Sequence, residues 1–164
     1  KSKYSLIKIK LVISNKVNAK GLDFAKKYKI KYFIINYKNI KISEIQILKK
    51  LNIYKIKLIC LAGFMKIISE NFIKKFNKPI LNIHPSLLPK YKGLNTHKKV
   101  LQNKEKFSGS TVHIVSKKLD SGKIILQKKI KISKNDNIKT LEKKILRLEH
   151  DLYPRAINKF LTSL

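Results

Sequence analysis

The sequence contains few cysteine, glycine, proline and acidic residues. Its 164 residues include one cysteine, five glycines, four prolines, no tryptophan, and nine aspartates and glutamates together. A single cysteine excludes the intramolecular disulfide framework that is typical of small secreted domains. Because Cys60 lies inside the apolar run Leu58–Phe64, we expect it to be a buried and unreactive side chain.

Long apolar runs are missing as well. The uncharged stretch around Cys60, Leu58–Met65, is far shorter than the roughly 20 residues that are needed to span a bilayer. The first residues, Lys1–Tyr4, are charged but do not lead into the apolar segment of a signal peptide. These absences predict a cytoplasmic protein with no membrane partner.

The formal net charge is +30, and it comes almost entirely from lysine. Arg147 and Arg155 are the two arginines, although arginine is better suited than lysine to bidentate contacts with phosphate or guanine. The lysines are spread along the whole chain, and lysine, isoleucine and asparagine all have A/T-rich codons. We therefore expect compositional drift and no specific nucleic-acid partner. A basic α/β module that binds RNA or another polyanion stays open as the non-enzymatic alternative.

Segments with strand and helix patterns alternate along the chain. The strand segments are short and apolar, and the helical segments carry apolar residues three or four positions apart. This order predicts one α/β domain over residues 1–164, with a Rossmann-like, open, mostly parallel sheet and helices on both faces. The predicted strands are 7–13, 32–35, 58–62, 81–83, 111–115 and 124–132, and the predicted helices are 19–28, 42–51, 69–75, 96–103 and 137–160, the last with a kink or break at Pro154.

Three polar residues lie at the ends of predicted strands, where open α/β sheets bind their ligands. Asn82 and His84 share one face of a strand, and Asp120 follows a later strand. A histidine exchanges protons near neutral pH, an amide can donate to an oxyanion, and a carboxylate can keep the histidine cationic. The structural alternative is that Asn82 and Asp120 form turns and that His84 is a satisfied surface histidine.

Longer motifs surround these three residues. The string N-I-H-P-S-L-L-P-K-Y-K-G covers Asn82–Gly93 and runs on into L-N-T-H, and G-S-T-V-H-I-V-S-K-K-L-D-S-G-K-I-I-L-Q covers Gly109–Gln127. Shorter strings are S-N-K at Ser14–Lys16, L-A-G-F-M-K-I at Leu61–Ile67 and E-H-D-L-Y-P at Glu149–Pro154. In order and spacing, these strings resemble the folate-dependent formyltransferases over almost the whole chain. Within that superfamily the glycinamide ribonucleotide formyltransferases are the most similar.

Two other branches of the superfamily stay open as alternatives. Methionyl-tRNA formyltransferases usually follow S-L-L-P with an R-G-A-A-P type segment and carry a further RNA-binding domain. Formyltetrahydrofolate deformylases usually alter the H-P-S-L-L-P stretch and carry an N-terminal regulatory domain. The string at Asn82–Gly93 shows neither change.

The resemblance also implies a phosphate-binding element that this sequence does not contain. Family members open with a strand and a G-x-G-S-N loop, whose backbone amides hold the substrate phosphate. Lys1–Ser14 contains no glycine. We therefore expect the N-terminal strand, loop and helix to be missing, and the chain as written to be unstable or inactive unless about twenty upstream residues are restored.

The resemblance implies catalytic roles for three residues. His84 acts as the proton donor, and its imidazolium stabilises a tetrahedral intermediate. Asn82 donates to the same oxyanion. Asp120 keeps His84 cationic and helps, through water, to remove a proton from the attacking amine. No metal is implied.

The resemblance further implies two small-molecule substrates, 10-formyltetrahydrofolate as co-substrate and glycinamide ribonucleotide as acceptor. Glu149 falls where the family contacts the acceptor amine. Thr111, His113 and His97 are weaker candidates, and Lys117-Lys118 stands where many relatives are acidic, which alters the local potential. The residues that would line the folate slot are Met65, Lys66, Ile67, Ile68 and Asn82.

Overall fold

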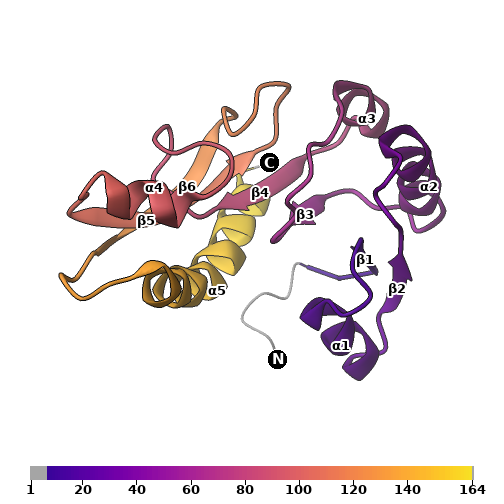
Figure 1. Cartoon of the computed structure of the whole chain (residues 1–164). Helices are drawn as coiled ribbons and strands as arrows, with labels where there is room; N and C mark the ends of the chain where they lie inside the picture. Colours follow the sequence, from indigo (N-terminus) through magenta and orange to yellow (C-terminus); the bar gives the residue numbers. More distant parts are fainter. Residues whose placement is uncertain (1–6, 164) are drawn as a thin grey trace. The chain divides into compact units, whose positions relative to one another are not determined.

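The computed structural model describes residues 7–163, and the chain divides into two compact units (Figure 1). The first unit contains the chain up to Lys57 together with Ile68–Lys78, and the second contains Leu58–Ile67 and the chain from Pro79 onward. Two strands pair in the first unit, and four strands form the sheet of the second.

The first unit is a small α/β layer. Its strands β1 (Leu11–Ser14) and β2 (Lys31–Ile34) pair in parallel, and a parallel pair requires a crossover, which α1 (Lys20–Lys27) supplies. The buried residues of α1, Leu22 and Ala25, lie three positions apart on the face that contacts both strands. The remaining helices of this unit, which contact each other, are α2 (Ile40–Ile53) and α3 (Glu70–Phe76).

A buried carboxylate joins α2 to the start of α3. Glu44 is 5% exposed and accepts hydrogen bonds from the Tyr37 hydroxyl at 2.9 Å, the Ser69 amide at 2.8 Å and the Ser69 hydroxyl. Ser69 is the N-cap of α3, as its sequence position predicts, and its Oγ accepts from the Phe72 amide. Burial raises the pKa of Tyr37, and the Glu44 carboxylate raises it further. Glu44 therefore determines where α3 begins.

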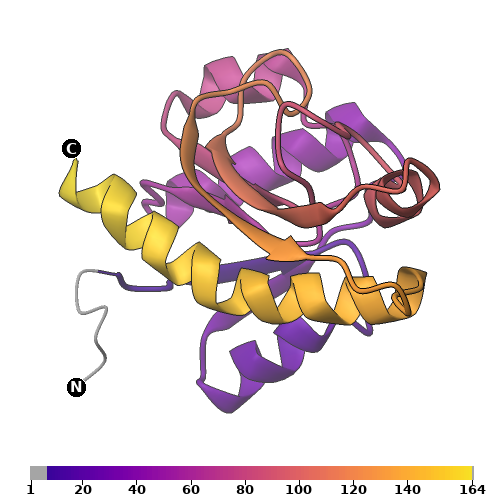
Figure 2. The same cartoon turned by 90° about the vertical axis from the view of Figure 1, so that its left-hand side faces the viewer.

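The second unit is built on a mixed four-stranded sheet. Its strand order is β3-β4-β5-β6, with β3 and β4 parallel and the other two pairs antiparallel. Helix α5 runs along one face of this sheet, where it contacts β4, β5 and β6 (Figure 2). The elements of this unit are β3 (Ile59–Leu61), β4 (Ile80–His84), α4 (Thr96–Gln102), β5 (Phe107–Ile114), β6 (Ile124–Lys131) and α5 (Ile138–Thr162).

Helix α5 covers the apolar face of the sheet. Its N-terminus has a capping box formed by Asn137 and Thr140. Further along the helix, Leu152 and Ala156 pack against Ile83 of β4 and against β5. The helix is continuous through Pro154, so the break considered from the sequence does not occur. Its buried residues lie three or four positions apart, at Leu141, Ile145, Leu148, Leu152, Ala156 and Phe160.

Helix α5 also contacts the backbone of two neighbouring strands, β3 and β4. The hydroxyl of Tyr153 lies 2.9 Å from the carbonyl oxygen of Leu61 and 3.0 Å from that of Leu81. Leu61 is the last residue of β3, and Leu81 directly precedes Asn82. Burial raises the pKa of Tyr153, so the group is a protonated donor at neutral pH.

The α/β class predicted from the sequence is confirmed, and every predicted strand and helix overlaps an observed element. The four-stranded sheet is mixed, because β5 runs antiparallel to both β4 and β6, whereas β1 and β2 pair in parallel. The predicted first strand, 7–13, begins only at Leu11. Over residues 7–163, no helix has the length and apolar character that crossing a bilayer requires.

The environment of Cys60 differs from the one predicted. Its side chain is exposed, because β3 is an edge strand of the sheet and fewer neighbours cover it. Desolvation by the surrounding protein nevertheless raises the pKa of the thiol to about 11, although a hydrogen bond with Tyr153 lowers it. The thiol stays protonated at neutral pH, in keeping with the unreactive side chain that we expected.

The Glu44 contacts predict a large effect on stability. Glu44→Ala removes a carboxylate that accepts from the Tyr37 hydroxyl and the Ser69 amide, and the loss of an acceptor costs about 1–3 kcal/mol for a buried donor. We expect urea denaturation of Glu44→Ala to show a loss of this size. The matched control is Glu142→Ala, at an exposed helical glutamate, with a change within about 0.5 kcal/mol. Equal midpoints for the two variants would contradict this role of Glu44.

Candidate active site

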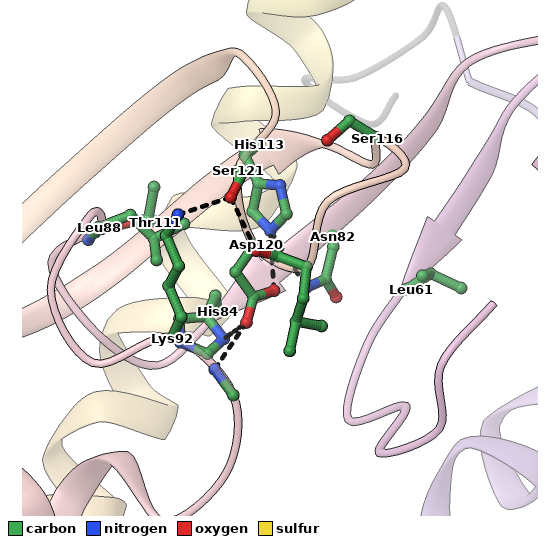
Figure 3. Close-up of polar contacts among 12 residues, drawn as sticks. Leu61, Asn82, His84, Leu88, Lys92, Thr111, His113, Ser116, Asp120 and Ser121 are labelled. Carbon is green, nitrogen blue, oxygen red and sulfur yellow. Dashed lines mark hydrogen bonds and ion pairs between the residues drawn. The ribbon is translucent and has the colours of Figure 1, made fainter. Parts of the chain in front are cut away.

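The carboxyl end of β4 carries the two polar residues singled out from the sequence. Asn82 and His84 are alternate residues of this strand, so they share one face of the sheet. Ile83, between them, faces α5 on the opposite side. In the neighbouring strand β5, His113 lies opposite Asn82 and Thr111 lies opposite His84 (Figure 3). The four side chains form a polar cluster on the face that α5 does not cover.

Asp120 joins this cluster from the loop between β5 and β6. One carboxylate oxygen, Oδ2, lies 3.4 Å from Nδ1 of His84, and the other, Oδ1, lies 3.5 Å from Nε2 of His113. Figure 3 shows the carboxylate between the two rings. His84 and Asp120 are 5% and 9% exposed. His84 is therefore buried, and it is not the surface histidine that the structural alternative assumed. Asn82, half-buried, is the most accessible of the predicted trio.

The surroundings of His84 favour its cationic form. Its Nε2 lies 2.9 Å from the carbonyl oxygen of Tyr91, and its Nδ1 faces Asp120. Both neighbours are acceptors, and only the doubly protonated imidazolium can donate to both. The distance of 3.4 Å between His84 Nδ1 and Asp120 Oδ2 is longer than that of a strong charge-assisted hydrogen bond, which is about 2.7–2.9 Å. The contact with Asp120 is therefore the weaker of the two.

The carboxylate of Asp120 is held in its ionised form. Burial raises the pKa of this group, but the hydrogen bond with His113, the Gly93 amide at 2.9 Å and the charge of His84 outweigh burial and lower the pKa overall. Asp120 has a φ of 46°, in the left-handed region. Gly122 makes this turn possible, because a Cβ there would overlap the carbonyl oxygen of Ile114.

The turn after β4 is held by Thr111, which is fully buried. Its Oγ1 donates to the Ser86 carbonyl at 2.6 Å and accepts from the Leu88 amide at 3.1 Å and from Gln127 Nε2 at 2.7 Å. This turn leads to the segment in which the Tyr91 carbonyl contacts His84. Thr111 was a weak candidate for a site residue in the sequence. In the structure its hydroxyl holds the turn after β4.

His97 has fewer contacts than the other histidines of this region. It lies on α4, and its Nδ1 is buried without a hydrogen-bond partner among the described residues. The pKa of His97 is lowered overall. Desolvation is the largest cause and lowers it, the charge of Glu142 raises it, and the charge of His84 lowers it. This weak candidate is therefore close enough to His84 to be affected by its charge.

The segment predicted to bind folate leaves the sheet beside Asn82. Leu61, the last residue of β3, is the register partner of Asn82 in the parallel pair. Met65 and Ile67 follow it and are 63% and 67% exposed. Lys66 is exposed too, whereas Ile68 is partly buried and belongs to the first unit. Binding of folate by these residues stays a prediction.

Glu149 lies on the opposite face of the sheet from Asn82 and His84. Its Oε1 accepts a hydrogen bond from Ser110 Oγ at 3.0 Å, and the same hydroxyl lies 2.8 Å from the His84 carbonyl oxygen. Burial raises the pKa of Glu149, against the lowering effect of Ser110. The carboxylate is thus joined to the backbone of His84 rather than to its ring, and its contact with the acceptor amine stays a prediction.

Sequence reasoning missed the backbone groups that contact His84 and Asp120. The Tyr91 carbonyl and the Gly93 amide reach His84 and Asp120 from one short segment. Gly93 has a φ of 76°, so the K-G pair in the motif was a detectable turn signal. The Tyr91 contact had no signal in the sequence, because any residue supplies a carbonyl. Within residues 7–163, no three histidine, cysteine or acidic side chains are grouped as metal ligands are.

The family assignment follows from a match along most of the chain. The formyl transferase family profile matches residues 1–157. The chain belongs to the formyl transferase family. This result confirms the resemblance that the motifs at Asn82–Gly93 and Gly109–Gln127 indicated.

Sequence relatives of this formyl transferase chain include enzymes of purine synthesis. A phosphoribosylglycinamide formyltransferase of Haemophilus influenzae is 40% identical over 156 residues, which cover 93% of this chain and 74% of the relative. A trifunctional purine biosynthetic protein adenosine-3 of Bos taurus is 42% identical over 156 residues. The chain spans only 15% of the length of that bovine protein.

Solved structures of formyl transferases share the fold. A phosphoribosylglycinamide formyltransferase from Bacillus halodurans superposes with a TM-score of 0.89 at 31% identity, covering 94% of this chain and 81% of the other. The enzyme from Coxiella burnetii, in complex with CHES, gives a TM-score of 0.87 at 38% identity, covering 96% and 75%. These similarities confirm the formyltransferase fold expected from the motifs.

The raised pKa of Glu149 predicts how stability depends on pH. A carboxyl with a raised folded-state pKa contributes stability below its ordinary pKa of about 4.3 and loses that contribution as pH rises through the folded value. Above this range, Glu149→Gln should be at least as stable as the parent chain, because the amide oxygen can still accept from Ser110. Urea denaturation at pH 5 and pH 8 checks this, with Glu142→Gln as the exposed control. A clear stability loss at pH 8 would contradict it.

Proposed function

We propose that this chain transfers the formyl group of 10-formyltetrahydrofolate to the amine of glycinamide ribonucleotide, the reaction of a phosphoribosylglycinamide formyltransferase. The observation that supports this proposal most directly is the buried His84–Asp120 pair beside the half-buried Asn82. The names of the relatives support the same activity. We further propose a cytoplasmic location and small molecules as the partners, with no specific nucleic acid and no membrane.

The proposed chemistry is a direct acyl transfer. The acceptor amine attacks the formyl carbon, a new carbon–nitrogen bond forms, and negative charge collects on the formyl oxygen. The bond from that carbon to N10 of the folate then breaks. The proton lost by the attacking amine balances the proton gained by N10, so the products are the formylated amide and tetrahydrofolate.

Asn82 and the His84 imidazolium stabilise the developing oxyanion in this proposal. The Asn82 amide carries two N–H groups, and the contact with His113 at 3.3 Å uses only one of them. The second N–H is the direct donor. His84 contributes its positive charge and the proton on Nδ1. One pre-aimed donor of this kind is typically worth about 3–4 kcal/mol in the transition state.

Asp120 has two roles in this proposal. Its ionised carboxylate keeps His84 protonated, and it accepts, through water, the proton that leaves the acceptor amine. The exposed segment of Met65, Lys66 and Ile67, with Ile68, binds the pterin beside Asn82. Glu149 contacts the acceptor amine. No metal takes part.

A comparison of acceptors distinguishes this function from the activities of the other branches of the superfamily. The protein that contains this chain, in its full length, is incubated with 10-formyltetrahydrofolate and with glycinamide ribonucleotide, methionyl-tRNA or water alone as acceptor. We expect transfer to glycinamide ribonucleotide only. Formate release without an acceptor would instead identify a deformylase, and formylated tRNA a tRNA formyltransferase. Filter binding of RNA over a range of salt tests the polyanion-binding alternative, for which a steep, saturable salt dependence is expected.

Removing the His84 ring should affect turnover more than folding. We expect His84→Ala in the complete enzyme to lower kcat by about 10²-fold or more, because the lost interaction acts on the transition state. Thermal melting should change little in comparison. His150→Ala, at an exposed histidine of α5, is the matched control and should keep full activity. A large stability loss with normal specific activity would assign His84 a structural role instead.

Removing the charge of Asp120 should change the pH profile as well as the rate. In Asp120→Asn, His84 loses the carboxylate that faces its Nδ1. We expect a lower kcat, and a limb of the pH–rate profile that moves toward lower pH by about 1 unit or more. A profile that keeps its shape and position would contradict the pairing of Asp120 with His84.

A further inference from the structure

The backbone of Tyr91 has an uncommon conformation beside His84. Its φ of 57° lies in the left-handed region, which costs free energy for a residue that has a Cβ. The carbonyl oxygen of this residue lies 2.9 Å from Nε2 of His84. Because a carbonyl can only accept, Nε2 carries a proton and donates it to this oxygen. The orientation of the His84 ring therefore depends on the groups that hold Tyr91 in this conformation.

The side chain of Tyr91 is held at both its hydroxyl and its ring. The hydroxyl donates to Glu105 Oε1 at 2.8 Å and accepts from Asn103 Nδ2 at 3.0 Å, so its one proton is used and its oxygen has a donor as well. The ring packs against an apolar cluster of α4 and α5 that consists of Val100, Leu141, Ile145 and Leu148. These contacts fix the far end of the side chain.

Glu105 is an ionised and well-placed acceptor for that hydroxyl. The hydrogen bond from Lys90 lowers the pKa of Glu105 most, and the bond from Tyr91 lowers it further, against the effect of burial. A hydrogen bond to an ionised acceptor is stronger than one between neutral groups. The backbone amide of Glu105 also donates to the Val100 carbonyl oxygen at 3.2 Å, which connects the acceptor to α4.

Ser86 holds the neighbouring residue more closely than Tyr91 itself. Its buried hydroxyl lies 2.7 Å from the carbonyl oxygen of Lys90 and 3.3 Å from that of Tyr91. The shorter contact fixes the peptide group before Tyr91, whereas the direction of the Tyr91 carbonyl depends on the φ and ψ of Tyr91. The side chain of Tyr91 is therefore the stronger support for that carbonyl.

We propose that Tyr91 is a positioning residue for His84. Its hydroxyl, bound to Glu105 and Asn103, holds its own backbone in the left-handed conformation, and its carbonyl thereby keeps the Nε2–H of His84 bound. The second torsion of a histidine is otherwise broad, and a ring that rotates presents its charge to the oxyanion less effectively. This role rests on the proposed function, because it concerns the orientation of a group used in formyl transfer.

Nitrogen NMR tests the contact without any activity measurement. The full-length protein is labelled with ¹⁵N-histidine, and the loss of one set of signals in His84→Ala identifies the ring. We expect a protonated Nε2, whose signal in Tyr91→Phe moves toward that of a more weakly hydrogen-bonded nitrogen. Tyr28→Phe, at a tyrosine that is 63% exposed, is the matched control and should leave the signal unchanged. An unprotonated Nε2, or the same signal in Tyr91→Phe as in the unaltered protein, would overturn the proposal.

Kinetics of the full-length protein test the effect on catalysis. Tyr91→Phe should lower kcat about threefold and Tyr91→Ala about tenfold, with each KM changed less than about twofold. In the His84→Ala background, Tyr91→Ala should lower kcat less than about twofold, because its effect passes through His84. The limb of the pH–rate profile should move toward lower pH, as in Asp120→Asn but by less, since the carbonyl is the second acceptor that favours the charged ring.

A second cycle tests whether Glu105 acts through the same hydroxyl. Glu105→Leu should lower kcat by a factor similar to that of Tyr91→Phe. Combining the two substitutions should lower kcat less than about twofold below the lower single variant, because both remove one contact. Fully multiplied losses would contradict the part of Glu105 in this proposal.

The outcomes separate this proposal from the proposed function. Equal losses from Tyr91→Ala with and without His84 would show a structural role and overturn the positioning of that ring. If Tyr91→Ala does not fold, the NMR signals in Tyr91→Phe decide. Absence of formyl transfer by the unaltered full-length protein would instead overturn the proposed function.

Discussion

The Asp120 carboxylate has two oxygens, and the candidate site depends on how they are shared. Oδ2 accepts a hydrogen bond from the Gly93 amide and faces His84, whereas Oδ1 faces His113. A buried carboxylate needs such partners, because desolvation alone would favour its neutral form. Its negative charge lies between the two imidazole rings.

The backbone that holds these groups belongs to the sheet and to α5. The antiparallel register places His113 and Thr111 opposite Asn82 and His84. Tyr153 of α5 contacts one carbonyl group of β3 and one of β4, and Thr111 holds the turn that follows β4. The side chains of Asn82, His84 and His113 thus lie on paired strands, which are more rigid than loops, and Asp120 reaches them from the loop between β5 and β6. Precise placement is required, because donors act on an oxyanion only at short range.

Much of the candidate site could be predicted from the sequence. Asn82, His84 and Asp120 were identified from strand ends and motif strings, and the structure brings the three together. The Tyr91 carbonyl and Gly93 amide could not be found in this way, since every residue carries the same backbone groups. Glu149 was predicted from its motif, but whether it lies beside the ring or behind the strand depends on which face of β5 it meets.

The sequence by itself determined the family, the α/β class and the order of the elements. Those properties depend on local periodicity, on turn residues and on strings of neighbouring side chains, all of which can be detected along one chain. Only the tertiary structure decided the mixed pairing of the sheet, the exposure of Cys60 and the division of the Asp120 oxygens between two histidines. These depend on strand register and loop closure, which bring together residues such as Asn82 and His113, 31 positions apart. Such long-range pairing arises from the packing of whole elements and has no local signal.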